Sequence, residues 1–185
     1  MKEINLISSN PHKVEEIKVL AEPFDIKVNW INYTKLEIQA EDPSEIAKIG
    51  GELAFKELKK PLIVEDTGIF IKALNGFPGP YAAQCIKTIG LQGVLKLMTG
   101  EKDRSAQFKT AIAYVDDKGA KVFEGVVDGT ISESIREGRK FAFDTIFIPA
   151  GEKMTFSELG LEAKIKYSHR AIAFRKFAEY FTKGK

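Results

Sequence analysis

The segment that joins a short apolar run to the first expected helix carries residues suited to bind an anion. Ile4–Ile7 indicates a buried strand, Asn10 can cap a following helix and Pro11 suits its first position. The backbone N–H groups and the dipole of such a helix start attract negative charge. Lys13 is electrostatically unfavourable there unless an anion is bound. An ordinary turn with a surface lysine explains the segment equally well.

A pair of carboxylates follows the apolar run Leu62–Val64, which predicts another buried strand. Glu65, Asp66 and Thr67 come directly after it, and α/β proteins commonly bind ligands at strand ends. Mg²⁺ takes one or two carboxylates and completes its shell with water and phosphate oxygens. Because side chains alternate along a strand, only one of the two acids is expected to face such a site. A turn with solvated acids is the commoner explanation, and Glu37, taken alone, indicates a surface acid.

Two further segments carry aromatic and basic side chains. Phe141-Ala142-Phe143-Asp144 offers rings that could stack on a flat base and a carboxylate for its ring N–H groups, although core aromatics are the simpler explanation. Ser168 can cap a last helix, which places His169 and Arg170 at its positive end. The planar fork of Arg170 suits a phosphate or a carbonyl, whereas a lone His169 is more often structural.

Each of these segments is weak evidence by itself. Together with Lys164 they supply an anion loop, a metal carboxylate, aromatic rings and a basic cluster, which is the set that a nucleoside phosphate with Mg²⁺ requires. Neither a Walker A loop nor a Gly-x-Gly-x-x-Gly loop occurs. A nucleotide site in this chain would therefore differ from the two commonest phosphate loops.

The elements that must position these residues alternate between strands and helices. Helices are expected from Asn10, from Asp42 to about Leu58, over Tyr81–Ile89 and Leu91–Met98, and from Ser168. The expected strands are Ile4–Ile7, Ile26–Tyr33, Leu62–Val64, Ile69–Ile71, Phe108–Val115, Lys121–Val127 and Ile146–Ile148. The order predicts an α/β protein with a mixed sheet, folded as one unit over residues 1–185.

Composition limits the class of protein further. The 185 residues include 28 Lys and Arg against 26 Asp and Glu, and 44% are hydrophobic. A net charge of +2 argues against a polybasic nucleic-acid binder. The lone cysteine, Cys85, excludes an intramolecular disulfide and a multi-cysteine metal site, and favours a reducing compartment. No signal peptide or membrane span is recognisable, so we expect a soluble, cytoplasmic protein.

Four segments in order give the chain a resemblance to a known family. SSNPHK at 8–13, VEDTGIFIKALNGFPGPY at 64–81, FAFDTIFIP at 141–149 and SHRAIA at 168–173 resemble the inosine/xanthosine triphosphate pyrophosphatases, also called the HAM1 or ITPase family. The resemblance implies Mg²⁺-dependent hydrolysis of ITP, dITP and XTP to the monophosphate and pyrophosphate, which removes deaminated purines from the nucleotide pool. It also implies two α/β lobes around a central cleft, on a long twisted mixed sheet, and a homodimer.

The resemblance also implies roles for individual residues. Asp66 is expected to bind Mg²⁺ and help to activate water, and Glu37 to be a second ligand. Lys13 joins Asp66 as a catalytic residue, and Thr67 contacts substrate. The phosphate loop comprises Ser8, Ser9, Asn10, Pro11, His12 and Lys13. The base is held by Phe141, Ala142, Phe143, which stacks, and Asp144, while Lys164, His169 and Arg170 recognise the purine and its 6-oxo group.

The chain departs from the family pattern at several positions. The base segment is commonly FGYDPIF, whereas this chain has Ala142 for Gly, Phe143 for Tyr and Thr145 for Pro. A helix lysine sixteen residues before Asp66 in many members is Gly50 here. Two other functions stay open: a related pyrophosphatase for modified pyrimidine nucleotides, and a non-catalytic nucleotide-binding module.

Overall fold

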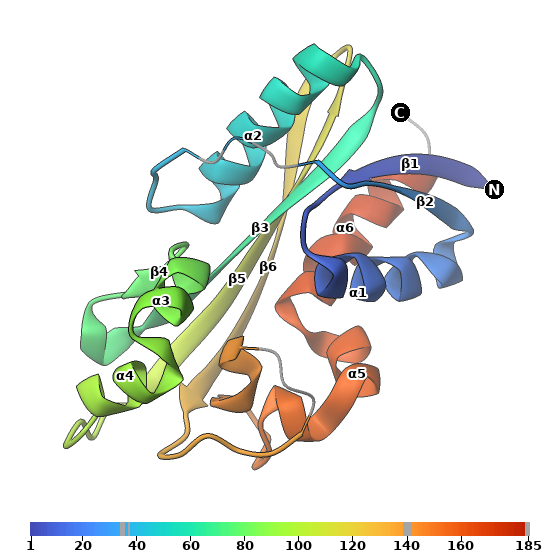
Figure 1. The fold of residues 1–185 in the computed structure, drawn as a ribbon. Coiled ribbons are helices and arrows are strands. Elements are labelled where there is room, and N and C mark those ends of the chain that lie inside the picture. The colour runs from blue at the N-terminus through green and yellow to red at the C-terminus, as the bar shows by residue number, and fades with distance from the viewer. Residues whose placement is uncertain (34–35, 37, 139–141, 184–185) are drawn as a thin grey trace.

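One mixed, twisted sheet runs through the whole molecule (Figure 1). The computed structural model describes residues 1–33, 36, 38–138 and 142–183. In this part of the chain the strand order is β2-β1-β3-β5-β6-β7, and β4 pairs with β3. The strands are β1 (Lys2–Ile7), β2 (Ile26–Ile31), β3 (Leu62–Ile71), β4 (Pro78–Gly79), β5 (Ser105–Asp116), β6 (Gly119–Ile131) and β7 (Phe147–Pro149). The predicted mixed α/β fold is confirmed.

Helices cover both faces of this sheet (Figure 1). The α-helices are α1 (Pro11–Ala21), α2 (Pro43–Leu58), α3 (Ala82–Thr88), α4 (Gly90–Leu97), α5 (Phe156–Tyr167) and α6 (His169–Lys183). Short 3₁₀ helices are η1 (Glu22–Phe24), η2 (Lys72–Leu74) and η3 (Ala142–Thr145). On β3, Ile63 packs in a core with α1 and α6, and Ile69 in a core with α3 to α5. Val64 points to the other face, where Gly51 of α2 lies over it.

The helix starts follow the local signals in the sequence. The side chain of Asn10 accepts hydrogen bonds from the backbone of the first turn of α1, with Pro11 at the first position. Asp42 caps α2 in the same way ahead of Pro43. Ser168 Oγ accepts from Ala171 N at 3.2 Å at the start of α6. These three predictions are confirmed. The sequence could predict them because each cap depends only on a few neighbouring residues.

Two expectations about secondary structure were wrong or incomplete. The runs Leu62–Val64 and Ile69–Ile71 are one continuous strand, β3, so Glu65 to Gly68 do not form a turn. These residues pair along their length with β5, and ion pairs with Arg170 and Lys13 make the burial of Glu65 tolerable. Helix α5 was not predicted, because Gly160, at φ 78°, interrupts it and weakens its periodicity. The capping box formed by Thr155 and Glu158 is the feature of the sequence that would have indicated the start of this helix.

Helix α6 approaches the sheet closely at a glycine of β6. A Cβ atom on Gly125 would lie 2.0 Å from the backbone oxygen of His169 and 2.6 Å from the nitrogen of Ala173. No side chain larger than hydrogen fits between the two backbones at this point. Gly125 therefore lets the first turn of α6, which carries His169 and Arg170, rest directly on the sheet.

Candidate active site

One edge of β3 lies open at the centre of the molecule. β1 pairs with this edge as far as Ile7 opposite Val64, and β4 pairs with it from Ile69 onward. Glu65 to Gly68 therefore lie in the gap between β1 and β4. A cavity of about 740 Å³ opens at this gap, a size suited to a small organic ligand. Although Glu65 and Asp66 point to opposite faces of β3, both line the cavity.

The phosphate loop expected from the sequence forms one wall of the cavity. Ser8, Ser9, Asn10, Pro11 and Lys13 line it, whereas His12 is exposed and lies outside the lining. Asn10 Oδ1 accepts from His12 N at 3.0 Å and Lys13 N at 3.4 Å. Lys13 Nζ lies 3.3 Å from Glu65 Oε1. The loop thus brings a cation to the open edge of β3.

A network of buried ion pairs forms the floor. The side chain of Arg170, 2% exposed, donates from Nε to Glu65 Oε2 at 2.9 Å and from Nη2 to Glu65 Oε1 at 3.1 Å. Its Nη1 donates to Glu16 Oε2. Lys164 Nζ binds the other oxygen of Glu16 and donates to Asp144 Oδ2 at 2.6 Å. Arg170 uses three of its five N–H groups in these contacts, and two remain.

The network sets the charges of its members. Burial opposes ionisation of Glu65, but the adjacent Arg170 and Lys13 bring its pKa well below the usual range. Burial also opposes ionisation of Glu16, and here Arg170 and Lys164 lower the pKa. For Asp144 burial outweighs the attraction of Lys164, so its pKa is raised. Asp144 is therefore the carboxyl group of this network that protonates most readily.

His169 lies in an aromatic part of the cavity wall. Its ring stacks on Phe108 with centroids 4.4 Å apart, and Nδ1 lies 2.6 Å from Thr110 Oγ1. Burial, together with the positive charges of Arg170 and Lys164, brings the pKa of His169 well below its usual value. The imidazole is therefore neutral at neutral pH.

The segment expected to hold a base is described only in part. Ala142, Phe143 and Asp144 line the cavity on η3, while Phe141 and the expected metal ligand Glu37 lie outside the described residues. Phe143 is 3% exposed and packs in the core. Ala142 has φ 39°, a left-handed conformation that glycine adopts without strain. The chain therefore keeps a glycine-like conformation with alanine.

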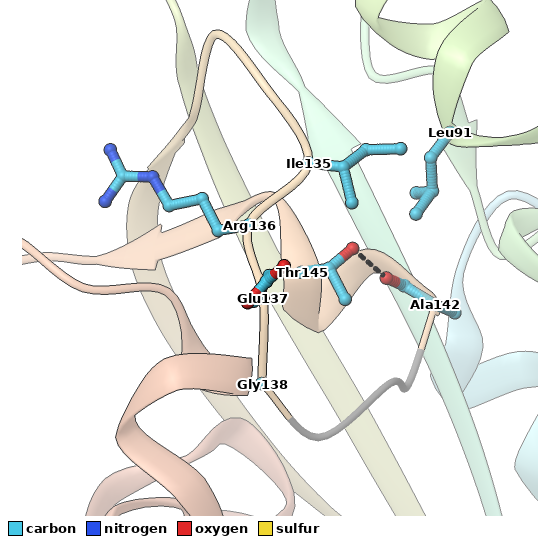
Figure 2. Close-up of a pocket in the computed structure, with 7 residues that line it drawn as sticks. All are labelled: Leu91, Ile135, Arg136, Glu137, Gly138, Ala142 and Thr145. Atoms are coloured by element: carbon cyan, nitrogen blue, oxygen red, sulfur yellow. Dashed lines mark hydrogen bonds between the residues drawn. The ribbon is translucent and has the colours of Figure 1, made fainter.

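A second cavity of about 510 Å³ lies beside η3 (Figure 2). Thr145 Oγ1 donates to Ala142 O at 2.9 Å in its wall. Figure 2 shows the Arg136 side chain directed away from Leu91, and its Nη1 donates to Lys153 O at 2.8 Å. Of the described residues that were expected to act on a ligand, only Ala142 lines this cavity, so the larger of the two cavities is the candidate site.

Several residues of the site were not identified from the sequence. Glu16 has the same side chain as its exposed neighbour Glu15, and only the packing of α1 sets it apart. Thr110 and Phe108 lie within β5, where nothing in the pattern singles them out. Lys87 of α3 lines the cavity and adds a cation. The predicted helix over Tyr81–Ile89 contained Lys87, but no local signal placed this helix at the site.

The fold and the site define a mixed α/β protein with a charged ligand cavity at an open strand edge. The chain belongs to the Ham1 family, which it matches over residues 4–180. It is 49% identical over 177 residues to a dITP/XTP pyrophosphatase of Saccharolobus solfataricus, covering 96% of this chain and 92% of that protein. It is 44% identical over 174 residues to a dITP/XTP pyrophosphatase of Thermococcus kodakarensis, covering 94% of each chain.

Solved structures of the same family share the fold. The Staphylococcus aureus Ham1 protein has a TM-score of 0.86 and 29% identity to this chain, and the match covers both chains completely. A HAM1 protein from Coxiella burnetii has a TM-score of 0.86 and 28% identity, also with complete coverage. The resemblance seen in the sequence is confirmed.

Proposed function

We propose that this protein hydrolyses non-canonical purine nucleoside triphosphates, namely ITP, dITP and XTP, to the nucleoside monophosphate and pyrophosphate. Relatives named dITP/XTP pyrophosphatase match nearly the whole chain and support this reaction. One observation carries the proposal: residues from all four segments noted in the sequence line the same cavity at the open edge of β3.

The loop after β1 is proposed to bind the phosphates. Its backbone N–H groups lie at the start of α1, and Lys13 brings a positive charge to the same wall. Hydrolysis between the α and β phosphates develops negative charge on their oxygens. Fixed donors and cations at that position stabilise it, which is usually the largest catalytic contribution.

Asp66 is proposed to hold Mg²⁺ together with Glu37. Carboxylate oxygens are the ligands that Mg²⁺ prefers, and Asp66 lies in the cavity on the face of β3 opposite to Glu65. Among described residues no group of three His, Cys, Asp or Glu side chains could hold a metal ion, so phosphate oxygens and water must complete the shell. When bound, the ion supplies positive charge to the phosphates. Asp66 is also proposed to orient the attacking water.

The base is proposed to lie towards η3 and α6. Phe143 and Asp144 line this part of the cavity, and Lys164 fixes Asp144 from behind. Arg170 lines the cavity, and two of its N–H groups are not used by Glu65 or Glu16. These N–H groups are suited to the 6-oxo oxygen of hypoxanthine or xanthine. Thr67 is the remaining proposed substrate contact.

The proposal is tested by pyrophosphate release from ITP, XTP, ATP, GTP, dTTP and UTP, with Mg²⁺ and with excess EDTA. We expect metal-dependent turnover of ITP and XTP. Preferred turnover of dTTP or UTP would favour the pyrimidine alternative, and nucleotide binding without turnover would favour a non-catalytic module. Asp66→Asn should remove most turnover and leave the circular dichroism spectrum unchanged. A rate near that of the wild type would exclude the role of Asp66.

Further properties are proposed from the family resemblance. We propose a homodimer, a single domain with two lobes around the cavity, a cytoplasmic location and no nucleic-acid partner. The continuous strands β5 and β6 support the single domain. No helix in the described part of the chain is long and apolar enough to cross a membrane. Sedimentation equilibrium tests the dimer.

A further inference from the structure

A chain of hydrogen bonds connects His169 to Glu65 through two hydroxyl groups. Thr67 Oγ1 donates to Glu65 Oε1. Thr67 Oγ1 and Thr110 Oγ1 are 2.6 Å apart, and Thr110 Oγ1 is 2.6 Å from His169 Nδ1. Each of these contacts needs one hydrogen atom between its two heavy atoms. A hydroxyl group can donate only one hydrogen, so all hydrogen bonds in this series must be donated in the same direction.

The direction is set at the Glu65 end. Both oxygens of Glu65 accept N–H groups of Arg170, and Lys13 lies 3.3 Å from Oε1. A carboxylate surrounded by cationic donors can only accept, so the hydrogen of Thr67 points to Glu65. The hydrogen between the two threonines must then come from Thr110. The hydrogen between Thr110 and the imidazole must come from Nδ1 of His169.

The neutral imidazole of His169 has one N–H group, and this chain of bonds places it on Nδ1. Nε2 therefore carries a lone pair and acts as an acceptor. No residue in the described part of the chain hydrogen-bonds to Nε2, and His169 lines the cavity. Stacking on Phe108 fixes the plane of the ring. An acceptor cannot bind the 6-oxo oxygen, which the family resemblance had assigned to His169 together with Lys164 and Arg170.

Arg170 follows His169 directly and lines the same cavity, and its guanidinium group can only donate hydrogen bonds. The two residues thus offer a donor beside an acceptor. The edge of hypoxanthine or xanthine has the complementary order, with an acceptor at O6 and a donor at N1–H. Adenine has the reverse order, with a donor amino group at position 6 and an acceptor at N1.

We propose that Nε2 of His169 accepts the N1–H group of the substrate base, and that Thr110 is the positioning residue that holds the imidazole in this form. The inference rests on the proposed function and deepens it. Adenine would place the lone pair of N1 against that of Nε2, and unpaired buried acceptors reduce kcat/KM by about five- to 150-fold. Guanine also carries N1–H, so this contact cannot discriminate ITP from GTP.

Nitrogen NMR of the histidine side chains tests the inference directly. The chain has two histidines, and His12→Gln assigns their signals. At neutral pH we expect His169 to show a protonated Nδ1 and an unprotonated Nε2. A protonated Nε2, or protonation of both nitrogens, would overturn the inference, whatever the enzyme hydrolyses. This measurement needs no substrate and no variant of the site.

Substrate selectivity provides the second test. Thr110→Val removes the hydroxyl that receives Nδ1–H, so we expect the imidazole form to change and the ITP preference over ATP to fall by about five- to 150-fold. The ITP to GTP ratio should stay constant. Thr110→Ser should keep both properties, and Thr130→Val, at an exposed position of β6, is the matched control. An unchanged ITP to ATP ratio in Thr110→Val would overturn the inference. Wild-type enzyme that hydrolyses no 6-oxopurine triphosphate would instead refute the proposed function.

Discussion

Replacing Arg170 by methionine should strongly destabilise the protein, because the side chain compensates two buried carboxylates. Removing one partner of a buried ion pair typically costs about 3–5 kcal/mol. Glu16 keeps Lys164 and Glu65 keeps Lys13 in this variant. We therefore expect a loss of unfolding free energy near the lower limit, about 3 kcal/mol, rather than twice the range. For a chain of this length the melting temperature should fall by about 6–12 °C.

The double variant Arg170→Met with Glu65→Gln removes one of the uncompensated charges and should be more stable than the single variant.

The pH dependence gives an independent test. In the wild type the lowered pKa of Glu65 and Glu16 stabilises the fold above the unfolded pKa, and this stability is lost as the pH falls. Without Arg170, burial of Glu65 is opposed only by Lys13 and Thr67, so the pKa of Glu65 should rise and the stability lost on acidification should become smaller. Guanidinium unfolding at several pH values measures both effects. A loss below about 1 kcal/mol, or no gain in the double variant, would refute the reasoning.

Two further variants test features of the backbone. Gly125→Ala should lower the free energy of unfolding by about 1–3 kcal/mol or more, because the new Cβ meets the backbone of α6 at 2.0 Å. Guanidinium unfolding measures this loss. A variant as stable as the wild type would contradict the close approach. Ala142→Gly should raise the free energy of unfolding by up to about 1 kcal/mol, because Ala142 has φ 39°. Ala120→Gly, in β6, is the control and should lose stability; an equal loss in both variants would exclude strain at Ala142.

Features set by neighbouring residues could be predicted from the sequence. Asn10 with Pro11 and Asp42 with Pro43 begin helices as expected, since a cap needs only its own first turn. The path of β3 through Glu65 and Asp66 could not be predicted, because the residues look like a solvated turn. What makes that path possible is Arg170, which is 105 positions away from Glu65 and neutralises it inside the protein.

Individual segments of the site could be recognised in the sequence, but their arrangement in space could not. Its motifs indicated a nucleotide, whereas the pairing of Arg170 with Glu16 depends on how α1 and α6 pack against each other. Glu15 and Glu16 are chemically identical, so the sequence alone cannot say which one enters the core. Thr110 acquires a role only because β5 places it between Thr67 and His169.

The charges of the site give a physical reason for metal dependence. Arg170, Lys164 and Lys13 each contact a carboxylate, so the network attracts a triphosphate much less than three isolated cations would. Binding cannot draw Arg170 or Lys164 away without weakening the compensation of buried acids, which is costly, whereas Glu65 keeps both contacts with Arg170 if Lys13 turns to a phosphate. Among the described residues Lys87 adds positive charge to the cavity from α3, and a divalent ion that accompanies the phosphates would add more. On this reasoning the fixed ion pairs hold the base-recognition groups in place, and the mobile ion neutralises the phosphates, so removal of the metal should weaken ITP binding far more than it weakens binding of the nucleoside inosine.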